Sequence, residues 1–115
     1  MRVVVADGSD FIRRMLRRAF MRAPGLELVG DSSCGQETLD LVASLHPDAV
    51  VTDLDLATLD GFELTRRLKS AYPEIHVVAH TSEGGAEPAM REAGASAFLM
   101  KGEAHRLIET LQRLD

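Results

Sequence analysis

Five side chains have the types and spacing that phosphoryl chemistry requires. They are Asp7, Asp53, Asp55, Thr81 and Lys101. Clustered carboxylates repel one another unless a cation holds them together, and a set of oxygen ligands suits Mg²⁺. A carboxylate beside such a cation can attack a phosphoryl group, while a hydroxyl and an ammonium group bind the transferring oxygens. The chemistry that this combination suggests is phosphorylation of an aspartate.

The apolar segments predict the elements that must bring these side chains together. β-Branched runs without polar alternation are typical of strands buried on both faces, and here they alternate with amphipathic stretches of helical spacing. The predicted strands are Val3–Ala6, an edge strand Leu26–Val29, Ala49–Thr52, Ile75–Ala79 and Ala97–Met100. The predicted helices are Phe11–Phe20, Thr38–Leu45, Leu64–Ala71, a short Pro88–Glu92 and Ala104–Leu114. The pattern predicts five βα units forming a doubly wound parallel sheet with helices on both faces.

The chemistry-bearing residues fall where these strands end. Sites in open parallel sheets form outside the carboxyl ends of the strands. Asp7, Asp53 and Lys101 directly follow predicted strands, and Thr81 comes shortly after another. If the first and third strands are neighbours, Asp7 and Asp53 converge in one cleft.

Length and composition limit the alternatives. A chain of 115 residues suits one compact domain, and its net charge of -5 argues against nucleic-acid or anionic-membrane binding. The sequence has no apolar run long enough to span a bilayer and no signal-peptide layout after Met1. The single Cys34 cannot form an internal disulfide, and the four histidines lack metal-ligand spacing. We therefore expect a cytoplasmic protein.

The sequence resembles the receiver domains of two-component response regulators over essentially its whole length, and is most similar to receivers of the helix-turn-helix output class. The resemblance rests on the order and spacing of six segments together. They are Val3–Asp7, Pro24–Gly30, Pro47–Asp53, Asp60–Leu64, His80–Ser82 and Ala93–Lys101. It implies a single receiver domain over residues 1–115, with a flavodoxin-like (βα)5 fold and strand order 2-1-3-4-5.

The resemblance also implies a role for each site residue. Asp53 would accept the phosphoryl group, Asp7 would be a metal-site acid, and the main-chain carbonyl of Asp55 would complete Mg²⁺ coordination. Lys101 would face the phosphate, and Thr81 would be the switch hydroxyl.

A switch and a set of partners follow from the same resemblance. Phe98 would be the switch aromatic that acts with Thr81 to repack a protein-interaction face. The phosphodonor would be a histidine kinase, a phosphotransfer protein or a small phosphodonor. The target would be an output domain or a downstream protein, and a homodimer stays open.

Three positions depart from the family pattern. Gly8 replaces one of two adjacent acidic residues, so we expect weaker Mg²⁺ binding than is usual in the family. Asp10 or Asp55 could compensate through a carboxylate or a bridging water, although Asp10 is better explained as a residue favoured at a helix N-terminus. Ala57 replaces a proline in the loop after Asp53, and Gly102 replaces a common cis proline, so we expect a trans peptide there.

Other functions stay open at this point. A pseudo-receiver would keep the fold and bind partners without phosphorylation, as Gly8 and the short fourth helix favour. Val50–Asp55 also resembles the first motif of haloacid-dehalogenase-type phosphatases, but Thr58 falls one place late and 115 residues leave no room for the complete core and cap. A flavin-binding flavodoxin-like function is less favoured, because no phosphate-binding loop follows the first strand. The Walker and Rossmann glycine motifs are absent too.

Overall fold

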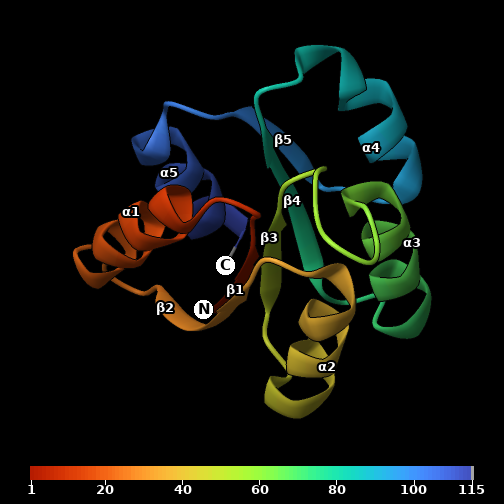
Figure 1. The fold of residues 1–115 in the computed structure, drawn as a ribbon. Helices are drawn as coiled ribbons and strands as arrows, with labels where there is room; N and C mark the ends of the chain where they lie inside the picture. The colour runs from red at the N-terminus through yellow and green to blue at the C-terminus, as the bar shows by residue number, and fades with distance from the viewer. Residues whose placement is uncertain (115) are drawn as a thin grey trace.

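Five parallel strands form one twisted sheet in the order β2-β1-β3-β4-β5 (Figure 1). The computed structural model describes residues 1–114, and Asp115, the last residue of the predicted domain, lies outside the described residues. The strands are β1 Arg2–Ala6, β2 Glu27–Ser32, β3 Ala49–Thr52, β4 His76–Thr81 and β5 Ala97–Met100. The predicted α/β class and the strand order 2-1-3-4-5 are confirmed.

Helices cover both faces of the sheet, with α1 and α5 on one side and α2, α3 and α4 on the other (Figure 1). The helices are α1 Asp10–Met21, α2 Gly35–Leu45, α3 Gly61–Ala71, α4 Glu87–Ala93 and α5 Ala104–Leu114, with a 3₁₀ turn at Gly84–Ala86. Among the described residues, no helix is long and apolar enough to cross a bilayer.

Two apolar layers pack against the central strands. On the α1/α5 face, Val5 packs with Leu16 and Leu107. On the opposite face, Val4 packs with Leu64. Successive residues of a strand point to opposite faces, so a strand covered on both faces must be apolar throughout. This explains the unbroken apolar runs of the central strands β1 and β3.

The edge strand and the fourth helix match their predictions with shifted ends. β2 lies at the edge as predicted but extends to Ser32, because its pairing with β1 resumes at Gly30 after a bulge. The predicted short helix is α4, of seven residues, with Pro88 in its first turn. Its Met90 is fully buried, so tertiary packing holds a helix too short to be stable alone.

Candidate functional site

Asp7 and Asp53 lie one residue beyond β1 and β3, at the carboxyl edge of the sheet. Backbone hydrogen bonds continue the strand ladders through both residues: Asp7 N donates to Ser32 O at 2.9 Å, and Asp53 N donates to Ala6 O at 2.8 Å. Asp7 is 1% exposed and Asp53 is 8% exposed. The strand order thus brings two buried carboxylates together, as the sequence predicts.

The ammonium group of Lys101 joins these carboxylates. Its Nζ lies 2.9 Å from Oδ2 of Asp7 and 2.7 Å from Oδ2 of Asp53. Burial by itself lowers the pKa of Lys101, but the hydrogen bonds and charges of Asp53 and Asp7 outweigh it and raise that pKa above its ordinary value. Lys101 is therefore a fixed cation at the centre of the cluster.

The remaining carboxylate oxygens are held by backbone donors. Oδ1 of Asp7 accepts from the N–H of Ser9 at 2.9 Å, and Oδ1 of Asp53 accepts from the N–H of Leu54 at 2.7 Å. Charge-assisted hydrogen bonds of this kind fix the orientation of each side chain. The Oδ2 atoms are therefore the ones that face Lys101.

The main-chain carbonyl oxygen of Asp55 lies close to Gly8. A Cβ added at Gly8 would lie 3.2 Å from the main-chain carbonyl oxygen of Asp55, so a side chain at position 8 would point toward that carbonyl. Asp7 and Asp53 supply carboxylates at the same edge. Within residues 1–114, no group of three or more His, Cys, Asp or Glu side chains could hold a metal. Two carboxylates and a carbonyl are oxygen ligands of the kind that Mg²⁺ prefers, with one carboxylate fewer than the resemblance implies.

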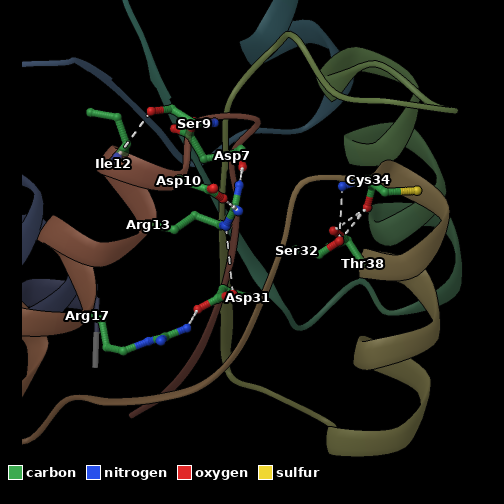
Figure 2. Close-up of polar contacts among 10 residues, drawn as sticks. All are labelled: Asp7, Ser9, Asp10, Ile12, Arg13, Arg17, Asp31, Ser32, Cys34 and Thr38. Atoms are coloured by element: carbon green, nitrogen blue, oxygen red, sulfur yellow. Dashed lines mark hydrogen bonds and ion pairs between the residues drawn. The ribbon is translucent and has the colours of Figure 1, made fainter.

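Asp10 does not replace the missing carboxylate. Its side chain is 73% exposed and pairs with Arg13, which also lies 3.8 Å from Asp31 and donates to the Asp7 carbonyl oxygen (Figure 2). Asp10 begins α1, as the helix-terminus interpretation predicted, but Ser9 is the cap: its Oγ accepts from the N–H of Ile12.

The two residues that are predicted to form the switch, Thr81 and Phe98, lie on β4 and β5. Thr81 ends β4, is 2% exposed, and its hydroxyl accepts from the N–H of Glu83 at 3.2 Å. Its carbonyl accepts from the N–H of Lys101 at 2.8 Å. Phe98 is half-buried against the cluster that contains Met90 of α4. A backbone hydrogen bond thus joins Thr81 to Lys101, and Phe98 packs against the cluster that contains Met90 of α4.

Two positions that support the site are clear only from the structure. A Cβ at Gly61 would lie 2.2 Å from the carbonyl oxygen of Asp53, so glycine lets the start of α3 pack directly against the Asp53 backbone. His80 is buried beside the cluster, and neither of its ring nitrogens has a hydrogen-bond partner among the described residues. The peptide bond at Gly102 is trans, as expected.

Comparisons with known proteins agree with this geometry. The sequence model of the response regulator receiver domain matches residues 3–112. The chain is 34% identical over 103 residues to the response regulator GacA of Pseudomonas aeruginosa, a match that covers 88% of this chain and 48% of that relative. It is 31% identical over 116 residues to the uncharacterized transcriptional regulatory protein YhcZ of Bacillus subtilis, covering 97% of this chain and 54% of that relative. The chain therefore spans about half the length of the curated relatives that it matches.

Solved structures show the same fold. A LuxR-family two-component response regulator from Aurantimonas sp. superimposes with a TM-score of 0.91 at 26% identity, covering 98% of this chain and 83% of that one. The response regulator domain of CheB from Thermotoga maritima gives a TM-score of 0.86 at 24% identity, covering 99% and 92%.

Proposed function

This chain belongs to the response regulator receiver domain family, and we propose that it is a phospho-aspartate receiver in two-component signal transduction, with Asp53 as the phosphoacceptor. Membership implies phosphorylation signalling, and receiver domains generally bind Mg²⁺ at the phosphorylation site. The observation that carries the assignment is the Lys101 ammonium shared by the two buried carboxylates of Asp7 and Asp53.

The proposed reaction is an in-line displacement at phosphorus. Oδ2 of Asp53 forms the new P–O bond, and the leaving group departs with the electron pair of the bond that breaks. Lys101 turns from the carboxylates to the transferring oxygens and neutralises their charge, and the Thr81 hydroxyl donates a hydrogen bond to them. Asp7, Asp53 and the Asp55 carbonyl would hold Mg²⁺, which supplies further charge neutralisation when bound. With Gly8 in place of an acid, that binding is weaker than usual for the family.

In this proposal the signal leaves through the face formed by α4, β5 and α5. Thr81 and Phe98 would move together after phosphorylation, because Thr81 follows the phosphoryl oxygens and Phe98 packs against the α4 cluster. The proposed donor is a histidine kinase, a phosphotransfer protein or a small phosphodonor in the cytoplasm, and the proposed target is an output domain or downstream protein. The domain, over residues 1–115, assists its own phosphorylation and turns over no metabolite.

Intact-mass spectrometry after incubation with acetyl phosphate tests this function. We expect a single phosphoryl adduct that depends on Mg²⁺ and is lost in Asp53→Asn. Asp60→Asn is the matched control, because Asp60 caps α3 in the same loop without contacting Lys101. An adduct that survives in Asp53→Asn would refute the assignment of the phosphoacceptor.

A pseudo-receiver is the second candidate, and Gly8 is the observation that favours it. Position 8 carries no carboxylate, and the Lys101 ammonium already holds Asp7 and Asp53 together. In this case the folded protein would acquire no adduct even at high Mg²⁺, while Gly8→Asp would acquire one. That pair of results would replace the receiver function with a phosphorylation-independent interaction module.

A further inference from the structure

His80 is a buried polar side chain with no partner. It is 1% exposed, and both Nδ1 and Nε2 lack hydrogen bonds within residues 1–114. No other buried side-chain nitrogen or oxygen of the described residues is left in this way. Unpaired buried polar atoms cost free energy and are rare in native proteins, so each one calls for a reason.

The sheet register places His80 beside Asp53. In the parallel pairing of β3 with β4, Val51 lies opposite Val78 and Thr52 lies opposite Ala79. Val51 and Val78 both face the α1/α5 core. Side chains two residues further along a strand return to the same face, so Asp53 and His80 are neighbours on the α1/α5 side.

The side chain of Lys101 must pass over His80. β4 lies between β5 and β3, and His80 pairs with Leu99 of β5. Lys101 comes two residues after Leu99 and therefore leaves β5 on the same face. Its ammonium nevertheless lies 2.7 Å from Asp53, the residue that directly follows β3 on the far side of β4. The lysine methylene chain thus crosses the end of β4 where His80 lies.

The hydrogen-bonding capacities of the His80 ring and the Lys101 ammonium match. A buried imidazole whose two ring nitrogens both lack partners is disfavoured as a cation, because an unpaired buried charge is costly, so one ring nitrogen of His80 is an acceptor. An ammonium group has three donors, and the contacts with Asp7 and Asp53 account for two of them. Lys101 thus keeps one further donor, and the His80 ring keeps one acceptor.

Phosphorylation changes what Lys101 can bind. When Oδ2 of Asp53 forms the bond to phosphorus, it becomes an ester oxygen and a poorer acceptor, so the ammonium must redistribute its donors. We propose that His80 is a positioning residue for Lys101: its unprotonated ring nitrogen accepts one N–H of the ammonium as Asp53 becomes phosphorylated, and so holds the lysine over the transferred group. This inference rests on the proposed receiver function.

Ring ¹⁵N NMR of the wild-type protein tests the contact directly, before and after acetyl phosphate with Mg²⁺. The protein has four histidines, and His80→Val assigns the His80 signals by their loss. We expect the signal of the unprotonated nitrogen of His80 to shift on phosphorylation. His76→Val is the matched control, because His76 lies on the same face of the same strand but at its far end.

Labelling kinetics by intact mass provide the second readout. We expect His80→Val to acquire the phosphoryl group about 2- to 10-fold more slowly than wild type at equal donor concentration, since one hydrogen bond to Lys101 is lost. His76→Val should label at the wild-type rate. Urea unfolding without donor should show that His80→Val is at least as stable as wild type, so that slow labelling reflects Lys101 and not unfolding.

The outcomes separate the inference from the function on which it rests. An unchanged His80 ring signal on a phosphorylated protein, together with wild-type labelling of His80→Val, would overturn the inference and leave His80 as core packing. Absence of any adduct on the wild-type protein would overturn the receiver function and this inference with it.

Discussion

Removal of the Lys101 ammonium should leave two buried carboxylates without their cation. We expect Lys101→Met to destabilise the fold by about 2–4 kcal/mol at neutral pH. The side chains of Asp7 and Asp53 are 2% and 11% exposed, so neither recovers full hydration in the variant. Breaking a fully buried pair costs about 3–5 kcal/mol. The value here is lower because the Lys101 side chain is 17% exposed, and water can partly replace it.

Equilibrium urea unfolding followed by circular dichroism measures this loss. With a slope of about 2 kcal/mol per molar urea, the middle of the range for a small domain, the midpoint should fall by roughly 1–2 M. Arg106→Met is the control, because Arg106 pairs with Glu103 on the surface and an exposed pair contributes at most about 1 kcal/mol. A loss in Lys101→Met no larger than in Arg106→Met would refute the view that Lys101 holds the carboxylates.

The pH dependence of the stability lost in Lys101→Met tests whether this loss is electrostatic. The pKa of Lys101 is raised in the folded protein, so its contribution is complete below the unfolded lysine pKa of about 10.4. It is lost only as the pH rises through the higher folded value. We therefore expect the difference in the free energy of unfolding between wild type and Lys101→Met to stay constant from pH 7 to about pH 10 and to become smaller above that pH.

Three further changes probe neighbouring positions. Gly8→Asp should tighten Mg²⁺ binding by about tenfold or more, since even outer-shell partners contribute about 10- to 100-fold in metal affinity. Calorimetry measures this affinity, and an unchanged value would show that position 8 does not face the cation. Gly61→Ala should lower stability by about 1–3 kcal/mol in urea, because the new Cβ meets backbone at 2.2 Å, whereas Gly85→Ala meets nothing within 4 Å. The lowered pKa of His80 means that the unfolded chain takes up its proton first, near pH 6.5, so stability falls as the pH drops from there toward the folded value. His80→Val should lose this part of the acid sensitivity, and an identical stability slope between pH 5 and 7 would contradict it.

The sequence is sufficient to predict that Asp7, Asp53 and Lys101 meet at one edge of the sheet, because strand ends are marked by a change of residue type. Asp7, Asp53 and Lys101 each interrupt an apolar run, and parallel strands necessarily bring such positions to one edge. The short α4 could be predicted too, since Pro88 and Gly94 limit its length from both ends.

Other features depend on geometry that residue types do not carry. Ser9 and Asp10 are both good helix caps, and only the backbone conformation decides that Ser9 is the one. In the sequence, His80 directly follows the predicted strand Ile75–Ala79 and lacks metal-ligand spacing to the other histidines, so nothing there singles it out. Its place beneath Lys101 depends on the register of β4 with both neighbours, and a shift of one residue would turn the ring to the other face.

Gly8 and Lys101 are best understood together, through the charge of the site before and after phosphorylation. Two carboxylates and one ammonium leave a single net negative charge in the free protein, which the fold tolerates because every carboxylate oxygen of Asp7 and Asp53 has a donor. An acid at position 8 would add a charge that only a further cation could balance. In the proposed reaction, phosphorylation would replace one carboxylate charge by a phosphoryl group of nearly two charges, so the need for Mg²⁺ should appear in the loading reaction and hardly in the stability of the free protein.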